Sequence, residues 1–179
     1  MSVALTFVGD DAEIDRARDA LDASRGPAWM EENALFFETC FVVDDVDVFR
    51  HGTRREETII VGSDGRSTGV DYHPVSDTPR IPLLNVMASG RRAFETALAT
   101  GRATWHVAGG GSVDFVELGG DSVRISGTGW TNGINEVASV IEVRAAFDAF
   151  RRSAIEYIAT HLPELMDHPG WASALRAYD

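Results

Sequence analysis

Apolar and polar residues alternate through three short segments in the second half of the chain, and glycine bounds each segment. The segments are ATWHVA, SVDFVEL and DSVRIS, separated by GGG and by a Gly-Gly pair. Alternation with a period of two predicts strands, and glycine between two such strands predicts a hairpin turn. The chain from Arg102 onward therefore predicts an antiparallel meander, which the segment EVASVIEV extends as a fourth strand to about residue 142.

The register of the meander follows from the type of turn. Three-residue turns with a left-handed glycine are a common hairpin connection. They keep apolar residues together on one face, whereas two-residue turns would mix the faces. The predicted inner face carries the rows Trp105–Phe115–Val123 and Val107–Val113–Ile125. The predicted outer face carries His106, Asp114 and Arg124 in one line. That line is either a binding or acid–base strip, or a solvated row of charges.

A long amphipathic helix is predicted after the meander. Its apolar stripe recurs at steps of three and four residues, and charged side chains take the opposite side. Pro163 is predicted to stop or kink this helix, because proline lacks an N–H group and clashes with the preceding turn. The stripe comprises Val143, Ala146, Phe147, Phe150, Ala154, Ile155, Ile158 and Leu162.

The first half of the chain predicts a mixture of strands and helices. SVALTFVG reads as a strand, and Asp10 or Asp11 is placed to cap a helix that ends at Gly26-Pro27. ENALFFETCFVVDDVDVF predicts a buried central strand and a turn at Asp44-Asp45. ETIIVGSDGRSTGVDY predicts a hairpin. A further helix is predicted from Ile81 or Pro82 to a left-handed cap at Gly101.

These elements predict an α+β fold, with a mainly antiparallel sheet around residues 102–142 packed by two or three helices and a long C-terminal helix. The length of 179 residues fits one domain spanning 1–179. The proline-containing segment 74–82 is the one candidate boundary, and it is too short to divide the chain into domains.

The charge of the chain is strongly negative, at −12, and all sixteen basic residues are arginines. A general nucleic-acid-binding role is disfavoured, because such proteins need a basic surface. No apolar run reaches the length of about 20 residues that a membrane helix needs. The N-terminus lacks the basic segment of a signal peptide. Cys40, the single cysteine, is predicted to be a buried, inert thiol. We expect a cytoplasmic protein.

The sequence carries no recognisable catalytic or cofactor signature. The five histidines show neither HxxxH nor HxH spacing, and Asp71-x-His73 lacks a nearby third ligand, so no metal site is predicted. No GxSxG elbow occurs, and GGGSVDF fits a hairpin better than a phosphate loop. We therefore predict no catalytic residues, no metal and no cofactor, and leave enzymatic activity as an alternative.

Two features suggest a surface for a protein partner. The acidic residues form one candidate patch, which suits a cationic partner but is equally typical of a solvated turn. Trp130, in the loop GTGWTNGIN, is the candidate aromatic anchor of an interface, or else a plug for the end of the sheet. The acidic patch comprises Asp44, Asp45, Asp47, Glu56 and Glu57.

The closing segment VRAAFDAFRRSAIEYIATHLPELMDHPGW is similar in style to the endings of immunity proteins from bacterial polymorphic-toxin systems. This resemblance covers about the last third of the chain and carries over no individual site residue. It implies binding and neutralisation of a cognate toxin, whose surface would be basic. Two alternatives stay open: a small-molecule-binding or enzymatic domain with a pocket between the meander and the longer helices, and a homo-oligomeric accessory protein that uses a strand edge.

Overall fold

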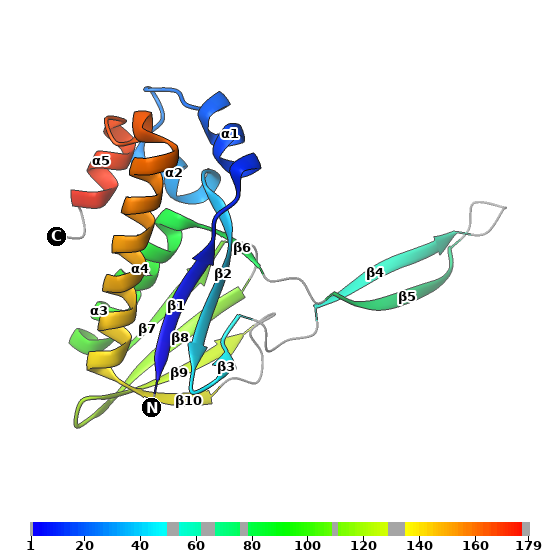
Figure 1. Cartoon of the computed structure of the whole chain (residues 1–179). Coiled ribbons are helices and arrows are strands. Elements are labelled where there is room, and N and C mark those ends of the chain that lie inside the picture. The colour runs from blue at the N-terminus through cyan, green and yellow to red at the C-terminus, as the bar shows by residue number, and fades with distance from the viewer. Residues whose placement is uncertain are drawn as a thin grey trace.

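The computed structural model describes residues 2–49, 54–61, 67–75, 79–108, 111–128 and 135–176, with the backbone alone for 54–61, 67–75 and 128. The chain has an α+β fold, as the sequence predicts (Figure 1). In order, the elements are β1 Val3–Val8, α1 Asp11–Asp19, α2 Pro27–Asn33, β2 Phe36–Val43, β3 Val46–Asp47, β4 Arg54–Val61, β5 Ser67–Val75, β6 Arg80–Pro82, the π-helical turn η1 Asn85–Gly90, α3 Arg91–Thr100, β7 Arg102–Val107, β8 Gly111–Gly119, β9 Ser122–Thr128, β10 Asn135–Ser139, α4 Val140–His161, the 3₁₀ turn η3 Pro163–Leu165 and α5 Pro169–Arg176.

The strands form two four-stranded antiparallel sheets and a separate hairpin, a division that the sequence did not reveal. The first sheet has the order β1-β2-β3, and β6 also pairs with β2. β2 is therefore central, as its continuous apolar character predicts. Asp44 and Asp45 form the predicted turn after it, with positive φ angles of 45° and 68°. The hairpin of β4 and β5 projects away from the body in Figure 1.

The second sheet is the predicted meander, in the order β10-β9-β8-β7. Its inner face consists of apolar side chains that are at most 4% exposed, and this assignment of faces is confirmed. The strand EVASVIEV was predicted too long, because helix α4 already begins at Val140. Ser139 keeps an extended backbone with ψ of 134°, and Glu142 in the first helical turn favours the positive helix end. The inner face comprises Trp105, Val107, Val113, Phe115, Val123 and Ile125.

The register of the meander differs from the predicted one by two residues in each hairpin. Trp105 lies opposite Val113 rather than Phe115, because the first loop follows Val107. Phe115 lies opposite Ile125 rather than Val123, and a bulge between Glu117 and Gly119 absorbs the difference. A shift of two residues changes each partner but preserves each face, since side chains alternate with a period of two.

Helix α4 packs its predicted apolar stripe into the space between the two sheets. Phe147 is 2% exposed and contacts Phe41 of the first sheet and Trp105 and Phe115 of the second. The helix ends at His161, two residues before Pro163, and Leu162 is its C-cap; the predicted stop at Pro163 is confirmed. Phe147 thus joins both sheets to one core.

The helix predicted from Ile81 or Pro82 begins later than expected. Arg80–Pro82 instead pairs with β2; the chain becomes helical at Leu83, and Asn85–Gly90 form a π-helical turn that passes into α3. The pairing of Ile81 opposite Phe37 buries both side chains, which favours strand over helix. Gly101 ends α3 with a φ of 90°, the left-handed cap that the sequence predicts.

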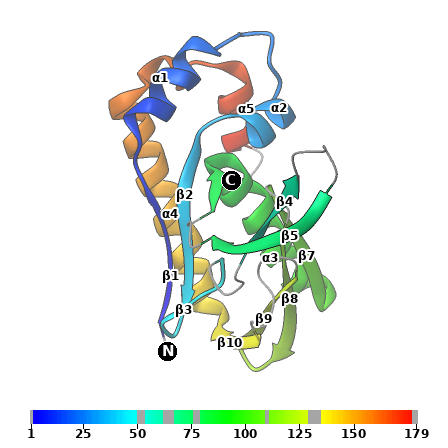
Figure 2. The same cartoon turned by 90° about the vertical axis from the view of Figure 1, so that its right-hand side faces the viewer.

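The shorter helices α1, α2 and α5 gather at one end of the molecule, opposite β3 and β10 (Figures 1 and 2). Asp10 caps α1 by accepting a hydrogen bond from the Ala12 N–H group. Pro27 does not end this helix as predicted: α1 ends at Asp19, and Pro27 opens α2. Cys40 is half-buried rather than buried, because it lies on the outer face of β2.

Candidate functional site

The acidic residues predicted to bind a partner divide into exposed and structural members. Asp44 and Asp45 are exposed in the β2–β3 turn, and an Asp44 carboxylate oxygen accepts a hydrogen bond from the Ser2 N–H group at 2.6 Å. Asp47 is half-buried, and its carboxylate accepts the Phe49 N–H group at 3.0 Å. Asp47 therefore stabilises the turn, while Asp44 and Asp45 remain available to solvent. The side chains of Glu56 and Glu57 lie outside the described part of the chain.

The predicted line of polar residues on the meander is wrong, although all three members share the outer face. Asp114 lies opposite Thr104 and Ser126 rather than beside His106 and Arg124. The two-residue shift in register causes this difference. His106 is opposite Ser112, and Arg124 is opposite Val116.

Asp114 has other partners instead. Its carboxylate accepts a hydrogen bond from the Thr104 hydroxyl and contacts the Arg102 guanidinium at 3.3 Å. Trp130, the proposed aromatic anchor, lies outside the described residues.

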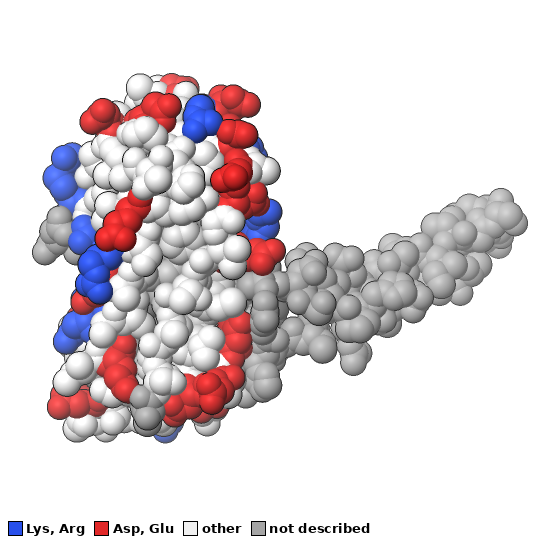
Figure 3. Space-filling model, in the orientation of Figure 1, with Lys and Arg blue, Asp and Glu red and all other residues white. Residues whose placement is uncertain are grey.

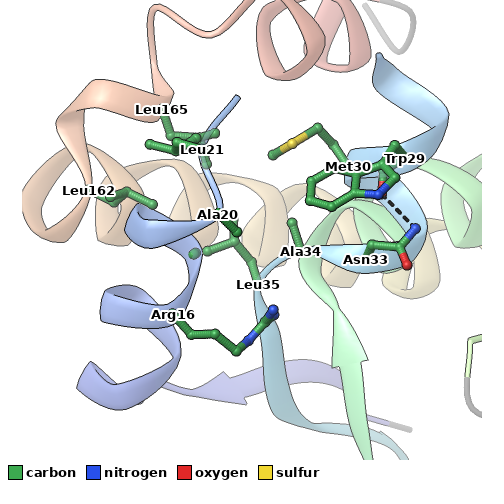
Figure 4. Close-up of a pocket in the computed structure, with 11 residues that line it drawn as sticks. Arg16, Ala20, Leu21, Trp29, Met30, Asn33, Ala34, Leu35, Leu162 and Leu165 are labelled. Atoms are coloured by element: carbon green, nitrogen blue, oxygen red, sulfur yellow. Dashed lines mark hydrogen bonds between the residues drawn. The ribbon is translucent and has the colours of Figure 1, made fainter. Parts of the chain in front are cut away.

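A small apolar crevice lies among α1, α2 and the C-terminal end of α4 (Figure 4). Leu21 and Leu162 approach it from one side, and Trp29 and Met30 from the other. The space open to the centre of a water molecule is only about 10 Å³, about the minimum that one water needs. This crevice is a packing gap between helices, too small for a ligand.

A larger groove runs between strand β7 and helix α3, and we call it the β7–α3 groove. One wall comes from residues at helical spacing on η1 and α3, and the other comes from consecutive residues of β7. Its volume is about 260 Å³, just below the range of roughly 300–1,000 Å³ that is typical of small-molecule pockets. The lining residues are Ser89, Arg92, Ala93, Thr96, Ala103, Thr104, Trp105 and His106.

Strand β7 is an edge of its sheet, and its register shows which backbone groups face the groove. The Glu117 N–H group donates to the Gly101 carbonyl oxygen at 2.9 Å, in step with the β7–β8 ladder. Hydrogen-bonded pairs alternate along an antiparallel ladder. The backbone groups of Arg102, Thr104 and His106 therefore point away from β8, towards the open edge.

Side chains close both ends of this edge. At one end, the Thr100 hydroxyl shares its single proton between the Arg102 carbonyl oxygen at 3.0 Å and the Thr96 carbonyl oxygen at 2.8 Å. At the other end, the Asn85 amide donates to the His106 carbonyl oxygen and accepts the Ala108 N–H group, both at 3.4 Å. The Asn85 side chain thus binds the backbone groups that a neighbouring strand would otherwise bind.

Between these caps, no described residue bonds to the backbone N–H or carbonyl of Thr104. Thr104 is also exposed. As far as the described part of the chain shows, the edge of β7 is therefore open at its middle residue.

A carboxyl group from α2 lies behind the helical wall of the groove. Glu31 accepts a hydrogen bond from the Ser89 hydroxyl. Burial raises the pKa of Glu31, and the nearby Arg92 guanidinium opposes that rise. Arg92 and His106 place cationic and titratable groups at the rim of the groove, in a protein whose overall charge is negative. The groove offers chiefly hydrogen-bond donors and acceptors suited to an extended backbone.

Sequence reasoning identified His106 but missed the other groove residues. Thr104 lies two residues before His106 and so shares its face, yet no local pattern shows that β7 lacks a second neighbour. The one local indication was the spacing of Ser89, Arg92 and Thr96, at steps of three and four residues, which places their side chains on one face of a helix.

The described residues also bear on metal and membrane binding. Among them, no group of three or more His, Cys, Asp or Glu side chains is placed to hold a metal ion. No helix in these ranges is long and apolar enough to cross a membrane.

Comparisons with known proteins give no relative. No family model matches the chain, and neither the curated proteins nor the solved structures contain a match.

Proposed function

We propose that this chain is an acidic protein-binding domain that acts in the cytoplasm and neutralises a basic partner, as an immunity protein neutralises its toxin. One observation carries the proposal: the negative charge of the molecule lies on exposed carboxylates that have no cationic partner within the described residues. Those carboxylates belong to Asp11, Asp19, Glu32, Glu38, Asp44, Asp45, Asp121, Glu156 and Asp167.

Most described arginines are already engaged with carboxylates of the same molecule. Arg91 and Arg144 join α3 to α4 through Glu95 and Asp148, with N–O distances of 2.8–2.9 Å. Arg80 bridges to Asp10 at 2.6 Å. Ion pairs within the molecule therefore neutralise much of its positive charge, and the remaining carboxylates are available to a partner.

The acidic side chains are unevenly distributed over the face in Figure 3. They border its lower edge, where Figure 1 places the N-terminal end, β3 and β10, and its upper right side. Arginines follow the left side and also lie among the acidic side chains at the upper right, and an uncharged area lies in the middle of the face. A mainly acidic border such as the lower edge accelerates the encounter with an oppositely charged protein.

A direct test uses the protein encoded beside the gene for this chain. We expect co-expression to relieve growth inhibition by that protein, and the purified pair to associate more slowly as salt is added. A neighbouring protein that neither binds nor is neutralised would contradict the proposal.

Charge reversal tests whether the β2–β3 turn steers the partner. Asp45→Arg should lower the association rate at low salt by about threefold to tenfold. Asp167→Arg makes the same charge change elsewhere on the acidic surface and shows how much of the effect is specific to the turn. Equal rates for Asp45→Arg and the unmodified chain would remove the turn from the steering surface.

One observation favours a small-molecule-binding or enzymatic role as the second candidate. His106 lines the β7–α3 groove, which has a volume of about 260 Å³. The pocket expected from the sequence lies between the meander and the longer helices, which include α4. No α4 residue lines this groove, however. A thermal-shift screen of metabolites would support this role only if the stabilisation disappears in His106→Ala.

A further inference from the structure

We propose that the β7–α3 groove binds a partner protein by strand addition: an extended segment of the partner pairs with the open edge of β7 opposite Thr104. This inference rests on the proposed function, because it names how the partner of that binding domain is held. Unpaired strand edges are templates for a further strand, and peptides that add to an edge gain main-chain hydrogen bonds.

The unpaired backbone groups on the open edge of β7 set the number of hydrogen bonds that a partner strand can form. Thr104 offers both its N–H group and its carbonyl oxygen. Arg102 and His106 each offer an N–H group, while their carbonyl oxygens accept the Thr100 hydroxyl and the Asn85 amide. An antiparallel segment of about five residues, centred on Thr104, satisfies these groups with four hydrogen bonds.

The walls of the groove determine the side chains of that segment. Residues on either side of the central one point inward, where Ala93 and Ala103 leave space beside buried Trp105. Small uncharged side chains such as valine or threonine fit that space. The central residue lies beside Thr104 on the solvated outer face, where a polar side chain is tolerated.

A second copy of this chain is a poor occupant of the same edge. In a two-fold pairing of β7 with β7, each copy would bring its own α3 to the same side of the joined sheet. α3 packs against β7 in each copy, so the two helical walls would collide over the edge. The groove therefore suits a lone strand from a different protein.

Peptide binding gives the first test. The probe is acetyl-Lys-Val-Thr-Val-Lys-amide, titrated to millimolar concentration into the isotope-labelled full chain and followed by NMR. We expect saturable shifts of the Thr104 and His106 amides and slower hydrogen exchange of the Thr104 amide. N-methylation of the central threonine of the probe should weaken binding by about tenfold, because it removes one main-chain donor. Saturation at other amides, or no saturable shift, would overturn the proposal.

A steric block gives the second test. Thr96 and Ala99 are both exposed on α3, but only Thr96 lines the groove. We expect Thr96→Trp to weaken probe binding at least about tenfold and Ala99→Trp to change it by less than about twofold. Equal effects of the two variants would argue against strand addition.

The outcomes separate this inference from the proposed function. If the cognate partner binds but Thr96→Trp leaves its affinity unchanged, strand addition at β7 is wrong and the binding role stands. If the probe binds as expected but no basic partner is neutralised, strand addition is supported and the proposed function fails. A dimer in sedimentation experiments that Thr96→Trp dissociates would assign the edge to a second copy instead.

Discussion

The side chains of Asn85 and Trp105 are joined by a buried hydrogen bond: the indole Nε1–H of Trp105 donates to the Asn85 Oδ1 atom at 3.0 Å. The residues are 6% and 1% exposed. The same oxygen accepts the Ala108 N–H group, and the Asn85 Nδ2 group donates to the His106 carbonyl oxygen. One amide therefore ties η1 to the whole end of β7 and anchors a core aromatic residue.

Asn85→Ala should lower the free energy of unfolding by about 1–3 kcal/mol, because it leaves the buried indole N–H without an acceptor. Urea denaturation followed by tryptophan fluorescence measures this change. Asn33→Ala is the matched control, since Asn33 is exposed and donates only to the Trp29 carbonyl oxygen at 3.1 Å. An equal loss in both variants would show that the Asn85 network contributes little.

Phe147→Ala should lower the free energy of unfolding by about 3–5 kcal/mol, because it opens a cavity where the two sheets and α3 meet. The ring contacts Phe41, Phe94, Trp105 and Phe115. Ile141→Ala removes a side chain from the same helix that is 68% exposed and should change stability by less than about 0.5 kcal/mol. Denaturant unfolding of the two variants distinguishes core packing from helix propensity.

Acid should destabilise the link between α3 and α4. Hydrogen bonds from Arg144 hold the pKa of Glu95 below its ordinary value of 4.5, and Arg91 adds to the effect. The folded state therefore favours ionised Glu95. Its contribution is complete above about pH 4.5 and disappears as the pH falls through the lowered pKa.

Glu95→Gln tests this dependence. The variant should be less stable at neutral pH by less than about 1 kcal/mol, because the half-exposed site is screened by solvent. Its stability should also decline less steeply in acid. Unfolding measured across the acid range checks both effects, with Glu156→Gln as an exposed control. A Glu95→Gln profile parallel to that of the unmodified chain would contradict the assignment.

Gly170→Ala should destabilise the docking of α5 by about 1–3 kcal/mol, because a Cβ atom there would lie 2.8 Å from the Arg25 carbonyl oxygen. Gly26→Ala makes the same substitution where nothing lies within 4 Å and should be neutral or stabilising by up to about 1 kcal/mol. Thermal unfolding compares the two. If Gly170→Ala leaves the thermal stability unchanged, the α1–α2 loop, which contains Arg25, moves at little cost to accommodate the added methyl group.

Hydrogen exchange should alternate along β7 in the free protein. The amides of Ala103 and Trp105 face β8 and should exchange slowly, whereas the Thr104 amide faces the open edge and should exchange much faster. NMR exchange rates of these three residues provide the measurement. Comparable protection at Thr104 would show that another group covers the edge.

Local periodicity alone determined much of the fold. The alternation from Trp105 to Ile125 predicted the inner face of the meander correctly, because burial on one face imposes a period of two whatever the partner residue. The stripe through Phe147 and Phe150 likewise predicted the face of α4, and Gly101 and Pro163 marked helix ends through their own backbone preferences.

Only the tertiary structure decided which strands are neighbours. The register between β7 and β8, the division into two sheets and the open edge at Thr104 depend on contacts between residues far apart in sequence. A two-residue slip leaves every face unchanged, so the pattern could not distinguish His106–Asp114 from Thr104–Asp114. The β7–α3 groove forms where residues 89–96 lie beside β7. This is a contact between separate segments, so no local sequence pattern predicts it. The acidic charge, in contrast, is a property of composition, and folding decided only which carboxylates remain without a partner.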